Sequence, residues 1–216
     1  MSQNRSTAVM QRRIEPHDSL DDFPTPPWAT RALCEFLLAE GHDLPALTCR
    51  EPAANRGHMV APLAEYFGTV DASDVHDYGV GIVVSDFLYP GAVPIVDFTV
   101  TNPPFRLAEQ FIKRALATSR VGVAMIVRAA FLEGVGRFDR LFSRHQPAHV
   151  LQFTERVVMH KGKLSAKGST ATAYCWIIWG ETDVGSMAHP SARISWIAPC
   201  RKRLERAYDY PVEVAA

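Results

Sequence analysis

The sequence has few cysteines, no long apolar run and no excess of charge of either sign. Its 4 cysteines are widely spaced and form no C-x-x-C pair, so neither a disulfide framework nor a zinc site or other metal site is indicated. No apolar run approaches the roughly 18 residues of a membrane span, and the first residues lack an apolar signal core. A cytoplasmic location without membrane contact is therefore the default expectation.

The charge balance limits the kinds of partner. Lysine plus arginine and aspartate plus glutamate both number 23, so the formal net charge at pH 7 is zero. Many nucleic-acid binders carry a global basic field, and without one any contact with phosphates depends on local clusters of cations. The 47% hydrophobic content and the length of 216 residues suit one domain with a substantial core.

The chain divides into a polar start and a long alternating region. Residues 1–20 predict a flexible N-terminal arm, and residues 21–216 predict a single domain. The apolar patterns predict helices at 29–40, 59–67, 107–118 and 138–144, and strands at 47–50, 69–72, 81–84, 96–101, 121–127, 149–153 and 171–179. Such alternation is typical of parallel crossover units. We expect an α/β fold, a three-layer α/β/α sandwich of the Rossmann-like type, with a mostly parallel seven-stranded sheet.

The most informative stretch is Asn102-Pro103-Pro104-Phe105, which follows the strand predicted at 96–101. The side-chain oxygen of Asn102 and the carbonyl of Pro103 can each accept one hydrogen of a planar amino group. The prolines fix the backbone, so these acceptors are preorganised. With both hydrogens held, the nitrogen lone pair can be aimed at a methyl donor without a general base. The stretch predicts an amino-group methyltransferase; the alternative is a proline turn with Phe105 in the core.

Three loops upstream carry groups suited to a nucleoside cofactor. In sheets of this kind, ligands bind outside the carboxyl ends of the strands. The loop 51–57 contains Asn55 and a glycine, both tolerant of a left-handed backbone. Asp74 follows the second strand and can accept from ribose hydroxyls, and Asp86 precedes Phe87, a pair suited to an adenine ring. Each residue alone is also compatible with a turn or a helix cap, so the prediction depends on their order.

Together these motifs resemble the DNA adenine-N6 methyltransferase family, especially its short phage-type members, over roughly residues 23–179. The resemblance implies S-adenosylmethionine as cofactor, the adenine amino group of DNA as acceptor, and a catalytic role for Asn102, Pro103, Pro104 and Phe105. It also implies cofactor contacts by Phe23, Thr25, Glu51, Ala53, Asn55, Gly57, Asp74, Asp86 and Phe87. The family usually has glycine at the position of Asn55, so here a side chain is expected near the methionine end of the cofactor.

Contacts with nucleic acid are predicted from a loop after the sixth strand. Residues 155–170 are punctuated by glycine and carry Lys161, Lys163 and Lys167, with no acid between Glu155 and Glu181. These lysines could meet phosphates, although solvated loop lysines are an equal alternative. Arg128, at the end of the strand 121–127, faces the same rim and is a further substrate-binding candidate. The basic run 201–206 is a weaker one, since such runs are usually exposed helix faces.

Two other functions are compatible with the sequence. The same chemistry serves RNA, or a protein glutamine whose side-chain amide also presents two hydrogens. A duplex DNA substrate requires the target adenine to leave the base stack, and a single-stranded or RNA substrate avoids that cost. A non-catalytic nucleic-acid-binding protein that retains the fold is the third hypothesis, motivated by Asn55 and by the small space for a recognition domain.

Overall fold

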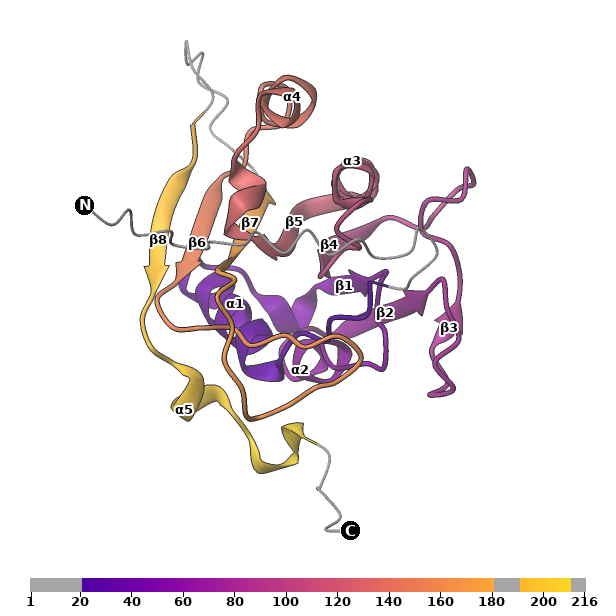
Figure 1. The fold of residues 1–216 in the computed structure, drawn as a ribbon. Helices are drawn as coiled ribbons and strands as arrows, with labels where there is room; N and C mark the ends of the chain where they lie inside the picture. The colour runs from indigo at the N-terminus through magenta and orange to yellow at the C-terminus, as the bar shows by residue number, and fades with distance from the viewer. Residues whose placement is uncertain (1–20, 181–190, 211–216) are drawn as a thin grey trace, which may run out of the picture.

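The computed structural model describes residues 21–180 and 191–210. The eight strands in these residues form one sheet in the order β3-β2-β1-β4-β5-β7-β6-β8 (Figure 1). The strands are β1 Thr48–Glu51, β2 Thr69–Asp74, β3 Val83–Val84, β4 Val96–Thr101, β5 Ser119–Arg128, β6 His149–Phe153, β7 Tyr174–Gly180 and β8 Arg193–Ile197. The predicted N-terminal arm, residues 1–20, lies outside the described residues.

Helices cover both faces of the sheet, as Figure 1 shows. On one side lie α1 (Pro27–Ala39), α2 (Val60–Ala64) and the short α5 (Arg201–Leu204), and on the other lie α3 (Ala108–Thr118) and α4 (Val135–Arg137). Short 3-10 helices occupy Leu44–Ala46, Ala129–Leu132 and Ala207–Asp209, and the predicted helix 138–144 is a π-helix at Phe138–Phe142. Among the described helices, none is long and apolar enough to span a bilayer.

The central strands are apolar on both faces, which is why helices pack on both sides. In β5, Ala124 and Ile126 belong to the cluster formed with α1 and α2. Val123, Met125 and Val127 point to the other side and pack with residues of α3. Near-continuous apolar strands of this kind are stable only when both faces are covered. The predicted three-layer Rossmann-like architecture is therefore confirmed.

The predicted number of seven strands is wrong, because β8 was not expected. It pairs in parallel with β6 at the edge of the sheet, where Ile194 and Trp196 remain 59% and 71% exposed. A five-residue edge strand lacks the two-sided burial that marks the central strands, so its pattern is weak. Strand β7 runs antiparallel to both of its neighbours, β5 and β6.

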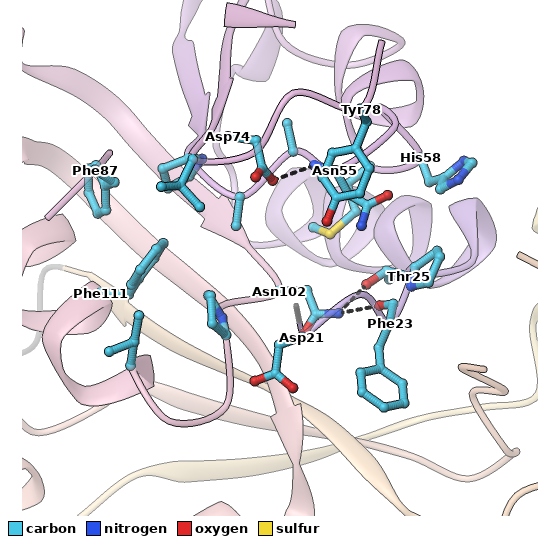
Figure 2. A pocket seen from close by; sticks show the side chains of 18 of the residues that line it. Asp21, Phe23, Thr25, Asn55, His58, Asp74, Tyr78, Phe87, Asn102 and Phe111 are labelled. Carbon is cyan, nitrogen blue, oxygen red and sulfur yellow. Dashed lines mark hydrogen bonds between the residues drawn. The ribbon is translucent and has the colours of Figure 1, made fainter. Parts of the chain in front are cut away.

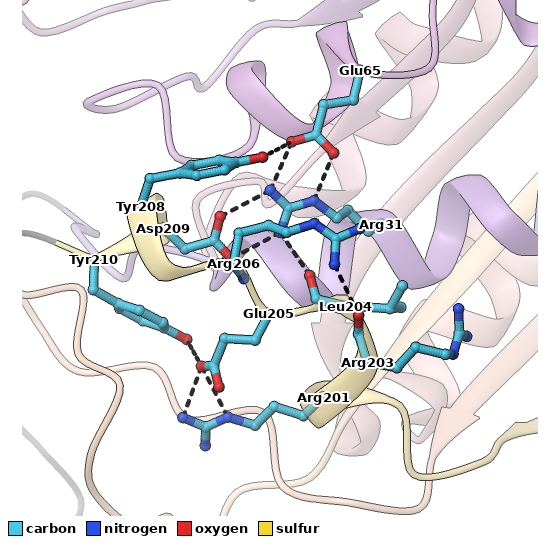
Figure 3. Close-up of polar contacts among 10 residues, drawn as sticks. All are labelled: Arg31, Glu65, Arg201, Arg203, Leu204, Glu205, Arg206, Tyr208, Asp209 and Tyr210. Atoms are coloured by element: carbon cyan, nitrogen blue, oxygen red, sulfur yellow. Dashed lines mark hydrogen bonds and ion pairs between the residues drawn. The ribbon is translucent and has the colours of Figure 1, made fainter.

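A buried arginine fastens the C-terminal segment 201–210 to the helices below the sheet (Figure 3). Arg31 of α1 is 1% exposed, and its guanidinium donates five hydrogen bonds of 2.7–2.8 Å. Two go to the carboxylate of Glu65, two to that of Asp209 and one to the carbonyl of Leu204. We call this group the Arg31 clamp. All five donors of the arginine are thereby used.

Candidate active site

A cavity of about 230 Å³ lies at the carboxyl ends of the parallel strands (Figure 2). This is below the range of roughly 300–1,000 Å³ for small-molecule pockets, so a nucleoside cofactor would fill it and extend through its mouth. The predicted residues that line it are Phe23, Thr25, Ala53, Asn55, Asp74, Asp86, Phe87, Asn102 and Pro104. The remaining predicted residues, Glu51, Gly57, Pro103, Phe105, Arg128, Lys161, Lys163 and Lys167, lie outside its lining.

The loop after β1 reaches the cavity through Asn55. This residue has a positive φ of 50°, as its place in a glycine-like position requires. Its backbone N–H donates to Asp74 Oδ2 at 2.8 Å, and its side-chain amide donates to Asp22 Oδ1 at 2.7 Å. Arg56 also pairs with Asp22, at 2.9 Å. The asparagine side chain is thus held by the N-terminal segment of the domain.

Glu51 lies beneath that loop and is completely buried. Its Oε1 accepts hydrogen bonds from the Ala53 N–H at 3.0 Å and from the Thr101 hydroxyl at 2.5 Å. Its Oε2 has no hydrogen-bond partner in the described part of the chain. Burial raises the pKa of the Glu51 carboxyl to about 8, although its two hydrogen bonds oppose this. Glu51 therefore links the loop to β4.

The carboxylate of Asp74 is oriented by the backbone. Its Oδ1 accepts from the His76 N–H at 2.9 Å and its Oδ2 from Asn55. Each carboxylate oxygen has a further lone pair, so both can still accept from a ligand. Tyr78 stands at the same side of the cavity under the guanidinium of Arg56, 4.6 Å from its ring centre. Burial raises the pKa of Tyr78 to about 12.

Asp86 and Phe87 line the far end of the cavity. Asp86 is exposed and its Oδ1 accepts from the Leu88 N–H at 2.8 Å. Phe87 is 5% exposed and packs on Phe111 with 5.3 Å between ring centres. A fixed aromatic ring beside a carboxylate offers one stacking surface and one hydrogen-bond acceptor. This combination suits a flat heterocycle that carries an amino group.

The tetrapeptide 102–105 has at least two hydrogen-bond acceptors that no described residue uses. The Asn102 amide nitrogen donates to the Phe23 carbonyl at 2.9 Å and to the Thr25 hydroxyl at 3.0 Å, which fixes the carboxamide as Figure 2 shows. The Pro104 carbonyl is taken by the Leu107 N–H at 2.9 Å. Among the described residues, nothing donates to Asn102 Oδ1 or to the Pro103 carbonyl. A ligand with two N–H groups could use both.

Phe105, the last residue of the tetrapeptide, lies outside the lining of the cavity. Its backbone N–H donates to Asp21 Oδ2 at 2.7 Å, and its ring lies 5.4 Å from that of Phe23. The guanidinium of Arg128 stacks over the same ring at 4.0 Å from its centre. The predicted catalytic aromatic and the predicted substrate-binding arginine are therefore in direct contact.

The loop between β6 and β7 covers the N-terminal segment of the domain. Met159 is buried, and its sulfur lies 3.8 Å from the Asn102 amide nitrogen. The Gly162 N–H donates to the Asp22 carbonyl at 2.7 Å. Lys161, Lys163 and Lys167 project from this loop and are exposed. Their contact with phosphates stays a prediction.

Several residues of the site were not predicted, and three of them hold predicted site residues in place. Asp21, Asp22 and Met159 support Phe105, Asn55 and Asn102 respectively. The only available signal was two adjacent acids directly before the proline-rich segment, which is weak because most loop acids are solvated. In the basic run 201–206, Arg201 pairs with Glu205 at 3.0 Å and Arg203 with Glu35 at 2.5 Å. These two arginines serve the packing of α5.

No protein-family model matches the chain, and no curated protein matches it. Its fold is similar to solved methyltransferases. A protein of Listeria monocytogenes described as a class I S-adenosylmethionine-dependent methyltransferase has a TM-score of 0.63 and 12% identity, over 83% of this chain and 67% of that one. A Pyrococcus horikoshii protein described as an RNA methyltransferase has a TM-score of 0.57 and 19% identity, over 78% and 91%.

A third similar structure is the methyltransferase subunit of a type I restriction-modification system from Streptococcus thermophilus. It has a TM-score of 0.58 and 10% identity and matches 88% of this chain. The chain spans 50% of the length of that subunit. At these identities the similarity concerns the fold, and the chain has the Rossmann-like methyltransferase fold.

Proposed function

We propose that this protein is an S-adenosylmethionine-dependent methyltransferase that acts on the N6 amino group of adenine in DNA. The observation that carries the proposal is the pair of unused acceptors, Asn102 Oδ1 and the Pro103 carbonyl, beside a cavity suited to a nucleoside. An adenine amino group has the two hydrogens that this pair would hold. The similarity in fold to a restriction-modification subunit supports DNA as the polymer.

The residues around the cavity fit the proposed cofactor. Asp74 would accept from the ribose hydroxyls, because both of its oxygens are oriented by backbone N–H groups and line the cavity. Asp86 and Phe87 would bind the adenine ring, and Phe23 and Thr25 would face the methionine end. When bound, S-adenosylmethionine supplies an activated methyl group. The Asn55 side chain, which departs from the glycine of the resembled family, bonds to Asp22.

The tetrapeptide would act by holding the acceptor nitrogen. Because Phe23 and Thr25 use the amide hydrogens of Asn102, its Oδ1 is left as an acceptor in a fixed position. Two hydrogen bonds from the amino group to Oδ1 and to the Pro103 carbonyl would make the nitrogen pyramidal and direct its lone pair. Fixed acceptors lose little energy to reorganisation, and alignment of the reacting atoms lowers the barrier further.

Arg128 would have to leave the Phe105 ring before a base stacks there. The guanidinium now covers the ring at 4.0 Å, a distance at which cation–π attraction contributes about 0.5–2 kcal/mol. A stacking base would compensate for that loss. The displaced arginine would remain at the rim, where it could pair with a phosphate.

The decisive experiment measures transfer of labelled methyl groups from the cofactor to mixed-sequence DNA, followed by nucleoside analysis. The protein should label N6-methyladenine. Asn102→Ala should lower kcat by about 100-fold or more, the usual effect of removing one preorganised polar group, while calorimetry shows cofactor still bound. Gln146→Ala, which removes a carboxamide outside the cavity, is the matched control. An unchanged rate for Asn102→Ala would reject the mechanism.

An RNA or protein-glutamine acceptor is the second candidate. The fold similarity to a protein described as an RNA methyltransferase favours testing RNA beside DNA, and glutamine also offers two amide hydrogens. The three polymers should be assayed in parallel under the same conditions. Label in RNA or protein without label in DNA would replace the proposed acceptor and keep the chemistry.

A non-catalytic protein that retains the fold is the third candidate. It predicts no heat of S-adenosylmethionine binding at millimolar concentration and no thermal shift. Because Asn55, Asp74 and Asp86 all line the cavity, cofactor binding tests them together. Binding in the micromolar range would remove this candidate.

A further inference from the structure

A second hollow, on the other side of the tetrapeptide 102–105, is lined mainly by cations. Arg106 lies in the turn before α3 and Lys113 in the middle of that helix, and Arg137 and Arg140 come from α4 and the π-helix after it. The aromatic ring of Phe105 forms part of its wall. We call this region the cationic hollow.

The positive charge of the hollow is only partly neutralised. Glu109 is the one acid in its lining; it pairs with Arg140 at 2.9 Å and lies 3.7 Å from Arg137. The hydrogen bond from Arg140 lowers the pKa of Glu109, so this carboxylate is ionised and cancels one charge. Arg106 and Lys113 are exposed and form no ion pair with a described residue. The lining therefore keeps a surplus of cations.

The side chain of Arg137 is fixed in the hollow by contacts with neighbouring residues. Its Nη1 donates to the carbonyls of Phe131 and Glu133, at 2.7 and 2.6 Å, and its guanidinium stacks over the Phe131 ring at 4.1 Å. Phe131 also lines the hollow. Cations interleaved with aromatic rings form the kind of surface that binds the backbone and bases of single-stranded nucleic acid.

The hollow adjoins the site that would hold the target base. Asn102 and Pro104 line the cofactor cavity, while Phe105 lines the hollow, so the two depressions meet at the tetrapeptide. A nucleotide whose base lies against Asn102 has its own phosphates close by. The tetrapeptide thus contributes residues both to the proposed base site and to a cationic surface.

We propose that the cationic hollow binds the phosphodiester backbone next to the target adenine, so that this surface, and not the lysine loop 155–170, supplies most of the phosphate affinity. This inference rests on the proposed function, because it needs a nucleic-acid acceptor. Arg106 and Lys113 contact phosphates directly. Arg137 and Arg140 hold the carboxylate of Glu109 and add to the positive electrostatic potential of the hollow.

The test compares double variants that each remove two cations. Arg106→Ala with Lys113→Ala should preserve the fold, because neither side chain forms an ion pair with a described residue. Lys163→Ala with Lys167→Ala tests the rival loop. Arg120→Ala with Arg193→Ala, which removes two exposed cations at the starts of β5 and β8, is the matched control. Each full-length protein is titrated with fluorescent single-stranded DNA, duplex DNA and RNA by anisotropy, over a range of salt concentrations.

The hollow variant should bind about tenfold more weakly than the parent near 100 mM salt. The slope of log affinity against log salt should fall by roughly 1.4–1.8, as expected for two lost phosphate contacts. Its affinity for S-adenosylmethionine, measured by calorimetry, should equal that of the parent. The control variant should follow the parent in both measurements.

Failure of this inference differs from failure of the proposed function. If the parent methylates DNA and the hollow variant keeps its affinity and salt slope, the hollow is not the phosphate site, and the proposed function stands. A loss confined to the Lys163 and Lys167 variant also rejects the hollow as the phosphate site and assigns that role to the loop. If the parent binds cofactor but neither binds nor methylates any nucleic acid, the proposed acceptor is wrong, and the phosphate-binding role of the hollow is rejected as well.

Discussion

Two groups of charged residues, the Arg31 clamp and the cationic hollow, lie on opposite sides of the sheet and differ in how their positive charge is matched. In the Arg31 clamp, one guanidinium faces two carboxylates and a carbonyl, and every donor is used. In the cationic hollow, Glu109 is the one carboxylate in a lining that holds four cations. In the first group the side chains of Arg31 and Asp209 are only 1% and 2% exposed, whereas the side chain of Arg140 in the second is 60% exposed.

The contrast shows how a structural charge cluster can be distinguished from one available to a ligand. A buried charge is tolerated only when its partners and hydrogen bonds are complete, so a saturated cluster has nothing left for a ligand. An exposed cluster with surplus charge is stable because water solvates it, and it attracts ions of opposite sign. The clamp fastens α1, whose entry segment carries Phe23 and Thr25, while the hollow is open to a partner.

Breaking the clamp should have the largest effect on stability. Arg31→Ala leaves the carboxylate of Asp209, 2% exposed, buried without its cation. The free energy of unfolding should fall by about 3–5 kcal/mol, as for other buried ion pairs that lose one partner. Urea denaturation of both proteins measures the difference.

The matched control is Arg203→Ala, which removes an exposed bidentate pair with Glu35. This change should cost only about 0.2–1 kcal/mol, because water replaces an exposed ion pair at little cost. Equal urea midpoints for the two variants would show that burial does not distinguish the clamp from a surface ion pair.

Glu51 is buried like Arg31, but it has no oppositely charged partner among the described residues. Its folded-state pKa of about 8 lies above the ordinary value of 4.5, owing to burial. The folded protein therefore holds a proton that the unfolded chain releases between these values. Stability from this group is full below about pH 4.5 and is lost as the pH rises through 8.

Glu51→Gln should remove this pH dependence. The amide is neutral at every pH and can still accept from Ala53 and Thr101. Between pH 5 and 9 the parent should lose roughly 2–4 kcal/mol of unfolding free energy from this group, at about 1.4 kcal/mol per pKa unit. Thermal melts of both proteins across this range provide the measurement. Parallel curves would mean that Glu51 is already ionised when folded.

Removing charge from the hollow should have the smallest effect on stability. Arg106→Ala with Lys113→Ala should change the free energy of unfolding by less than about 0.5 kcal/mol, the usual range for exposed sites. A slight gain is compatible with relief of repulsion among the cations. A loss above about 2 kcal/mol in urea would assign the hollow a structural role instead.

The fold was predictable because its signals are local and repeated. The strand 96–101 was expected with the bounds that the structure has, since six consecutive buried residues form a clear pattern. Asn55 was expected in a left-handed conformation, and its φ is 50°. β8 was missed because an exposed edge strand lacks that pattern. The predicted helix 59–67 is shorter in the structure, at 60–64.

The cavity was predicted in part for a similar reason. Asp74, Asp86 and Asn102 all line it, because parallel strands bring their carboxyl ends to one edge of the sheet. Glu51 was also expected at the cofactor, yet it is buried under the loop. Its position depends on hydrogen bonds to Ala53 and to Thr101, fifty residues later. No local pattern encodes such a contact.

Local sequence patterns were sufficient to predict the alternation of most strands and helices and the left-handed backbone at Asn55, because periodicity and residue-specific backbone preferences act over a few residues. The tertiary structure decided which charges are matched and which are left over. Arg31 meets Asp209 across 178 residues, and Arg140 meets Glu109 across 31. Coulomb interactions depend on distance in space and on burial, and folding alone sets both.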